Sequence, residues 1–249
     1  MGSFIQVYTD GGGIREARVP DDYSGNGSQP FMLKFPGFRR SLLASLVASS
    51  TASRTSDVVT IAATAHGITT GANYIGFRFF YPGSPSLAAG WYDSVTDVQT
   101  NTISFSAPGA NFGSESVNAA ATYTTETTVW SGTLPANTLT KGSEMLHRAL
   151  KSCTSSAGNH FLKCKIGAGN IFHSANPANS SANAWSVGYV TFFETTRAAM
   201  VSGSMASGNS TINITTIDSE VDQPLSITLQ LSVASEFITI ISSTFEVIR

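Results

Sequence analysis

The side chains that could carry chemistry are few in this chain, and the histidines His66, His147, His160 and His173 come first among them. No two of these histidines have the His-x-His or His-x-x-x-His spacing that brings imidazoles together on a metal ion. His147 and His160 fall in or beside expected strands that flank a turn, so together with Cys164 they could form a zinc site. Satisfied histidines inside or on a sandwich are the favoured interpretation, and no metal or other cofactor is expected.

The two cysteines, Cys153 and Cys164, predict buried thiols rather than a disulfide framework. Cys164 stands at alternate positions with Leu162 and Ile166, so the three side chains share one face of an expected strand. A cysteine in such a row most often behaves as a small buried hydrophobe with a reduced thiol. A hairpin disulfide between Cys164 and Cys153 stays open as the alternative.

Carboxylates and serines form no recognisable catalytic pattern. The one acidic cluster, Asp-Ser-Glu-Val-Asp at residues 218–222, does not match a calcium-binding loop and is interpreted as a solvated loop. A glycosidase needs two carboxylates across a cleft, which a distant pair could still supply. No Gly-x-Ser-x-Gly elbow occurs, and neither Gly-Gly-Gly at residues 11–13 nor Ser-Gly-Ser at residues 202–204 has the strand-to-helix context of a phosphate loop. We therefore predict no catalytic residue.

Four aromatic residues are the candidates for a ligand or interface site. Tyr74, Tyr81, Trp91 and Tyr92 lie close together in the sequence. Tryptophan and tyrosine rings combine an apolar face with a polar tip, and exposed rings of this kind stack on sugars. A glycan on a host surface is therefore a possible ligand. The favoured alternative is that the four rings fill the core of a small β module or a subunit interface.

The composition is poor in charge but not in apolar residues. Of the 249 residues, 12% are charged and 41% are hydrophobic, and the net charge is −2. Soluble domains carry about 25% charged residues, so this surface must be built largely from Ser, Thr, Ala, Gly and Asn. Such a surface has little charge repulsion to keep copies apart, which favours an obligate oligomer.

Three classes of partner or location are disfavoured by the same composition. The 14 Lys and Arg residues are scattered apart from Arg39 and Arg40, so no basic stripe for nucleic acid is present. No apolar run of about 18 residues occurs, so no membrane insertion is expected. The first residues lack the charged and apolar blocks of a signal peptide, so export by a secretory route is not indicated.

Turn-forming residues and hydrophobic periodicity divide an all-β chain into three regions. Residues 1–56 predict an N-terminal extended arm and linker, with a strand at residues 4–8, a short helix at 39–47 and a polar linker at 48–56. Such an arm has little core of its own, so it should lie against a neighbouring subunit or a shell. Residues 57–118 predict a small β module that ends in a second linker or loop at 111–118.

Residues 119–249 predict one jelly-roll-like β-sandwich. The clearest element is residues 225–233, in which apolar and polar residues alternate strictly, as expected of a half-buried strand. Further strands separated by turn signals are expected at residues 123–130, 145–152, 161–166, 185–193, 198–202, 211–216 and 237–248. This number and spacing of strands is typical of a two-sheet sandwich.

Two segments resemble virion proteins of tailed bacteriophages. Residues 131–143 contain Pro-Ala-Asn-Thr-Leu, similar to a loop that leads into a jelly-roll domain in such proteins. The Lys-rich strand at residues 162–167, the aromatic strand at 185–193 and Arg197 extend this resemblance over residues 129–249. Residues 57–71 resemble a recurring element of phage tail fibres and other particle-surface proteins, in which His66-Gly67 is a turn and not a catalytic dyad.

The resemblance implies a non-enzymatic structural protein on the surface of a tailed-phage particle. It implies a homotrimer, fixed to phage capsid or tail proteins through residues 1–56, and of either a fibre/adhesin or a capsid-decorating cement type. The chain has no long shaft repeat, which favours decoration or a short fibre. A carbohydrate-binding module or carbohydrate-active enzyme is the alternative from another class.

Overall fold

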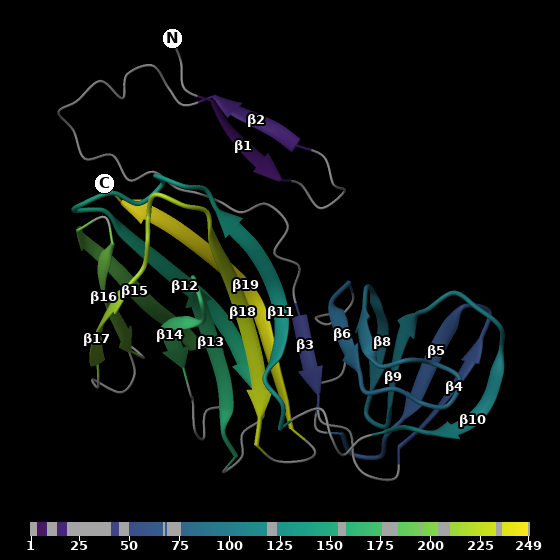
Figure 1. Ribbon diagram of the computed structural model, residues 1–249. Helices are drawn as coiled ribbons and strands as arrows, with labels where there is room; N and C mark the ends of the chain where they lie inside the picture. The colour runs from purple at the N-terminus through teal and green to yellow at the C-terminus, as the bar shows by residue number, and fades with distance from the viewer. Residues whose placement is uncertain are drawn as a thin grey trace.

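The computed structural model describes residues 4–8, 14–18, 41–44, 50–66, 68, 76–118, 124–153, 158–175, 184–194, 196–203, 210–232 and 236–248 (Figure 1). Every regular element in these ranges is a β-strand, so the all-β prediction is confirmed. Figure 1 shows a curved sandwich with a smaller sheet beside it. None of the described segments is a helix long and apolar enough to cross a membrane.

Two sheets form the sandwich. The four-stranded sheet has the order β11 (Thr127–Leu134), β18 (Gln223–Leu231), β13 (His160–Ile166) and β14 (Asn170–Ala175). The eight-stranded sheet has the order β17 (Ser210–Thr216), β16 (Arg197–Gly203), β15 (Ala184–Glu194), β12 (Glu144–Cys153), β19 (Phe237–Ile248), β3 (Ser41–Ala44), β6 (Arg78–Tyr81) and β7 (Gly90–Tyr92). All pairs are antiparallel except β3 with β6.

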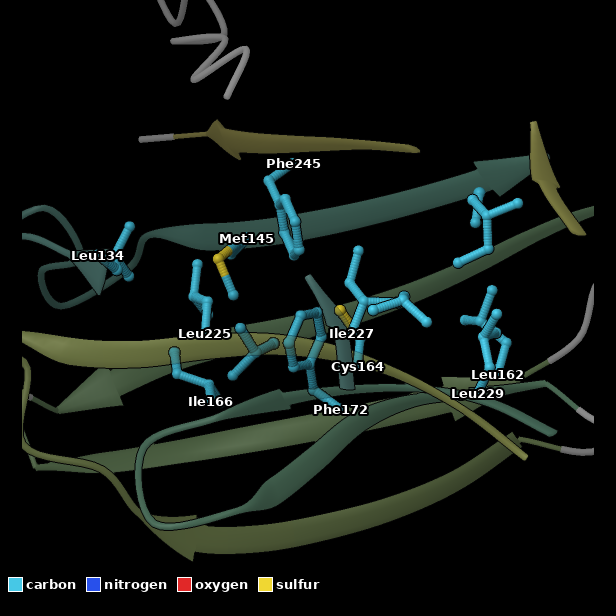
Figure 2. Packing of buried hydrophobic residues seen from close by; sticks show 14 of the residues in the cluster. Leu134, Met145, Leu162, Cys164, Ile166, Phe172, Leu225, Ile227, Leu229 and Phe245 are labelled. Atoms are coloured by element: carbon cyan, nitrogen blue, oxygen red, sulfur yellow. The ribbon is translucent and has the colours of Figure 1, made fainter. Parts of the chain in front are cut away.

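The strictly alternating segment forms β18, as predicted, and it supplies the middle of the sandwich core. Leu225, Ile227 and Leu229 are fully buried, and Cys164 lies opposite Ile227 on β13. Figure 2 shows Leu225, Ile227 and Cys164 in one cluster with Met145 and Phe245, which come from the eight-stranded sheet. Period-2 alternation therefore fixed which face of the strand is buried, because one face packs on the opposing sheet and the other does not.

Each strand predicted in residues 119–249 overlaps an observed strand, although β11 (Thr127–Leu134) begins and ends later than the expected 123–130, and one further strand was missed. β14 (Asn170–Ala175) pairs with β13 across a bulge between Cys164 and Lys165. Its apolar residues Ile171 and Phe172 are adjacent rather than alternating, so the strand has no period-2 signal. It is held by pairing with β13 and by burial of Phe172 in the sandwich core.

A second core lies under the smaller sheet, whose order is β10-β4-β5-β9-β8. Its strands are β4 (Thr51–Thr55), β5 (Val58–Ala62), β8 (Val95–Gln99), β9 (Thr102–Ser106) and β10 (Phe112–Ser116). The prediction of linkers at residues 48–56 and 111–118 is wrong, because β4 and β10 lie in these segments and pair with each other. Small and hydroxylated residues are typical of linkers when only the local sequence is considered. Here they form strands, because a partner strand supplies hydrogen bonds to their backbone N–H and C=O groups.

The helix predicted at residues 39–47 is also wrong where the structure describes it. Residues Ser41–Ala44 form β3, which pairs antiparallel with β19 and parallel with β6. Leu43 lies opposite Ile238, and Leu42 lies opposite Phe79. Backbone pairing on both edges outweighs the local apolar pattern, since helix propensity is a weak preference that tertiary contacts override. The N-terminal segment is therefore built into the sheet from residue 41 onward.

One hairpin, β1 (Phe4–Tyr8) with β2 (Ile14–Arg18), completes the described strands. The strand expected at residues 4–8 is confirmed, and its pairing partner was not predicted. The hairpin forms a two-stranded sheet of its own.

Replacing Arg54 by lysine is expected to lower the free energy of unfolding by about 2 kcal/mol. Arg54 is 7% exposed, and its Nε donates to the Ala110 carbonyl at 2.7 Å while Nη1 reaches the Ala107 and Pro108 carbonyls at 3.4 Å. A lysine ammonium cannot reproduce this planar fork. Denaturant unfolding would measure the loss, with Arg148→Lys as the matched control because the Arg148 side chain is 52% exposed. Equal stability of the two variants would contradict the assigned role.

Candidate functional site

The aromatic candidates do not form one exposed platform. Tyr81 is fully buried, with its ring centroid 5.4 Å from that of Phe105, and burial raises the pKa of its hydroxyl. Tyr92 is half-buried, lies 4.9 Å from Phe105, and donates its hydroxyl to the Ala88 carbonyl at 2.9 Å. Tyr74 lies outside the described residues. Tyr81 and Tyr92 therefore belong to the core of the smaller sheet.

Trp91 is the aromatic candidate that keeps a polar setting. It lies on β7, which is the last strand of the eight-stranded sheet, and its ring meets Phe80 edge-on at 5.3 Å. The Arg78 guanidinium is 5.6 Å from the indole centroid, and Arg78 Nε is 3.0 Å from Asp93 Oδ1. An indole beside a partly exposed Arg–Asp ion pair can offer stacking together with a donor and an acceptor.

The histidine and cysteine candidates are distributed through the sandwich interior. His147 on β12 is joined to Ser243 Oγ by a hydrogen bond of 2.7 Å and stacks on Phe245 at 4.6 Å. His160 belongs to β13 in the other sheet. Among the described residues, no three His, Cys, Asp or Glu side chains are grouped to hold a metal ion.

Neither Cys153 nor Cys164 is joined in a disulfide, and both are buried. Cys164 shares the buried face of β13 with Leu162 and Ile166, as the sequence predicted. Burial raises the pKa of the Cys164 thiol well above its usual value. The hairpin disulfide between Cys153 and Cys164 is not formed.

His66 has a structural task in the turn after β5. Its Nδ1 accepts from the Ile68 backbone N–H at 3.1 Å, so its Nε2 must carry the proton that it donates to the Gln99 carbonyl at 2.7 Å. The side chain is 1% exposed. Both ring nitrogens are therefore used to hold the turn against β8.

The acidic loop at residues 218–222 docks onto the Pro-Ala-Asn loop that follows β11. Asp222 Oδ1 accepts from the Ala136 N–H at 2.8 Å, and the Ser219 carbonyl accepts from the Asn137 N–H at 2.7 Å. Asp218 Oδ1 accepts from the Glu220 N–H at 2.9 Å. These carboxylates are engaged with backbone donors, which favours the interpretation as a structural loop.

A charged cluster that the sequence did not indicate lies on the four-stranded sheet. Glu126 binds Lys163 Nζ at 2.8 Å, contacts Lys165 Nζ, and accepts from the Thr228 hydroxyl at 2.9 Å. Partial burial alone would raise the pKa of the Glu126 carboxyl, but hydrogen bonds from Lys163, Lys165 and Thr228 outweigh it and lower the pKa to about 2. The alternation of Lys163 and Lys165 on the polar face of β13 was the available signal.

Replacing Glu126 by glutamine is expected to lower the free energy of unfolding by about 1–2 kcal/mol at pH 7. The folded-state pKa lies below the ordinary value of 4.5, so the carboxylate stabilises the fold above about pH 4.5, and this contribution is lost as the pH falls toward 2. Urea unfolding at pH 7 and pH 3 should show a smaller difference between these two pH values for Glu126→Gln than for the parent chain. The exposed Glu144→Gln serves as control, and an unchanged acid slope in Glu126→Gln would contradict the prediction.

Four titratable side chains lie inside the sandwich, and their proximity was not predicted from the sequence. Lys151 is 2% exposed on β12 opposite the core residue Ile240, and burial lowers its pKa to about 8. Cys153, two residues on, interacts with both Lys151 and Glu236. His160 Nε2 lies 3.3 Å from Glu236 Oε2, and both side chains are buried. None of these four groups reaches solvent to an extent that suits an open catalytic cleft.

Comparisons with known proteins leave the chain without a family. No family model matches it, and no curated protein matches it. Among solved structures, the VP2 subviral particle of infectious bursal disease virus is 10% identical, with a TM-score of 0.23, 99% of this chain covered and 65% of that one. The structure of the Gx strain of the same virus gives 11% identity, a TM-score of 0.21 and the same coverage. The chain thus spans about 65% of the length of these structures, and its role must be argued from its own residues.

Proposed function

We propose that this chain is a non-enzymatic structural protein on the surface of a virus particle, and specifically of a tailed phage. One observation carries the proposal. Only 12% of the residues are charged, and the histidine and glutamate side chains described above are used in hydrogen bonds or ion pairs that hold the fold. His66 and His147 hold backbone or side-chain partners, and Glu126 is enclosed by lysines. A protein with a charge-poor surface is suited to being covered by copies or by other subunits.

The resemblance of two segments to phage virion proteins supports the same role. Backbone N–H groups of the Pro-Ala-Asn loop at residues 135–137 donate hydrogen bonds to the acidic loop, which gives that motif a structural use. The strand β5 (Val58–Ala62) and the turn after it, which His66 holds, are in keeping with the second resemblance. The particle location, capsid decoration or short fibre, and the homotrimer are parts of this proposal.

Attachment to capsid or tail proteins is proposed for the N-terminal segment. The sequence suggested residues 1–56 as the anchor, but β3 and β4 tie residues 41–44 and 51–55 into the two sheets. Residues 1–40 are therefore the part to test. Their hairpin, β1 with β2, pairs with no other described strand.

Gold-labelled antibodies against the chain, applied to purified particles of the virus that encodes it, test the proposal. We expect labels at fixed sites on intact particles, and their position on the shell or tail separates decoration from fibre. The chain lacking residues 1–40 should no longer sediment with particles that lack the native protein, whereas the full chain should. Absence of the protein from purified particles would contradict the proposal.

A carbohydrate-binding role is the second candidate, and the setting of Trp91 favours it. The indole lies at the sheet edge beside the ion pair of Arg78 and Asp93. If the site binds a glycan, Trp91→Ala should abolish retention on a glycan array, while Tyr189→Ala, at an aromatic residue that is 41% exposed, should not. Retention that survives Trp91→Ala would exclude this site.

A further inference from the structure

The strand β17 is the last strand at one edge of the eight-stranded sheet. It pairs with β16 over its whole length, from Ser210 opposite Gly203 to Thr216 opposite Arg197, without a register shift. No described strand pairs with its other edge, which Figure 1 shows at the outer side of the sandwich. An antiparallel edge of this kind presents a row of backbone donors and acceptors that another strand can use.

Sequence devices that normally block such an edge are missing here. Residues 198–217, which contain β17 and most of β16, include no charged residue and no proline. The opposite edge of the sheet differs, because β7 has only three residues and is followed by Asp93 in its ion pair with Arg78. Natural sheets use charge, proline, bulges or short strands to prevent edge-to-edge pairing, so their absence from a regular seven-residue strand indicates an edge meant for pairing.

Two large hydrophobic side chains are exposed on the outer face near this edge. Ile214 is 64% exposed and Tyr189 is 41% exposed, and both are large hydrophobic residues. Ile214 lies opposite Ala199, and Ala199 lies opposite Thr191 on the next strand. Thr191 is two residues from Tyr189, so Ile214 and Tyr189 lie on the same face of the sheet. Pairing at the β17 edge would cover Ile214 and extend the apolar surface across two molecules.

The sequence of β17 identifies the partner. Residues 211–215 read Thr-Ile-Asn-Ile-Thr, which is the same in both directions about Asn213. In an antiparallel pair with a two-fold axis at Asn213, position 214 of one copy lies opposite position 212 of the other, and threonine lies opposite threonine. In an isologous contact residue i meets residue j and j meets i, so this sequence places like residues opposite each other on both sides of the axis.

We propose that β17 pairs antiparallel with β17 of a second copy of this chain, about a two-fold axis at Asn213. This inference goes beyond the proposed function and does not need it. A two-fold contact cannot close a trimer, so on a particle it would join one trimer to the next. A charged, bulky or bulged residue at the edge would prevent the contact without disturbing the sandwich core.

A single-cysteine cross-link tests the axis directly. In the full chain carrying Asn213→Cys, the two introduced residues face each other, and directly opposed residues of an antiparallel pair have Cα atoms about 4.5–5.5 Å apart, within disulfide range. Both native cysteines are buried, and neither is joined in a disulfide. We expect a covalent dimer in oxidised glutathione on a non-reducing gel. Val221→Cys, at a position that is 50% exposed, should give at least tenfold less dimer.

Adding Ile214→Lys to the Asn213→Cys chain should reduce the dimer yield at least tenfold, while Val221→Lys in the same chain should leave it unchanged. Thr216→Lys, also exposed on β17, is the second edge variant should Ile214→Lys fail to fold. Equal cross-linking at positions 213 and 221, or a dimer insensitive to charge on β17, would overturn the inference. Neither result bears on particle labelling, which tests the proposed function separately.

Discussion

Lys151→Met is expected to raise the free energy of unfolding by up to about 3 kcal/mol at pH 7. Lys151 is 2% exposed opposite Ile240 of the sandwich core, and burial lowers the pKa of its ammonium from 10.5 to about 8. At pH 7 the folded chain must therefore hold a proton on a poorly solvated amine. Methionine fills a similar volume without a charge, so the cost of burying the ammonium disappears.

The pH dependence gives the sign of this effect. Because the pKa of Lys151 is lower in the folded chain than in the unfolded one, the folded chain binds fewer protons between about pH 8 and 10.5. The free energy of unfolding of the parent chain should therefore rise over this interval, and that rise should be absent from Lys151→Met. The advantage of the variant should be largest below pH 8 and close to zero near pH 10.5.

Urea unfolding at pH 7 and at pH 10 measures the prediction. Lys141→Met removes the same charge from an exposed turn and should change stability little at either pH. A destabilised Lys151→Met chain, or a gain that persists at high pH, would show that Lys151 makes a favourable contact in the fold.

His160→Leu is expected to lower the free energy of unfolding by about 3–5 kcal/mol. His160 and Glu236 are buried with Nε2 and Oε2 3.3 Å apart, so removing the imidazole leaves the carboxylate in the interior without this neighbour. Burying a carboxylate with its partner removed costs far more than the pair contributes when intact. The large expected loss of stability therefore comes from the buried Glu236 carboxylate that has lost the imidazole, and not from a large stabilisation by the intact pair.

The double variant His160→Leu/Glu236→Leu separates this cause from simple loss of packing. It removes both polar groups, and most of the stability lost in His160→Leu should return. The double-mutant cycle is measured by equilibrium unfolding at pH 7. If the two single losses add in the double variant, the two side chains are not energetically coupled.

Local periodicity determined the strand content of the sandwich and the buried faces of its clearest strands. Residues 225–231 alternate in sequence and, except for the buried Thr228, in burial, and Cys164 lies on the buried face that its neighbours Leu162 and Ile166 predicted. These features follow from sequence because the side chains of a strand alternate between two faces whatever the strand pairs with. Charge content was equally direct, since it is a property of composition alone.

Tertiary structure decided the features that depend on residues far apart in the chain. Residues 41–44 became a strand because β19 and β6 satisfy their backbone on both edges, and β4 formed because β10 pairs with it. Glu126 meets Lys163 and Thr228 across 37 and 102 positions of sequence. No local pattern encodes such meetings, because backbone pairing and burial depend on which distant strand arrives alongside. The same holds for Lys151, which became an interior charge only when the second sheet closed over β12.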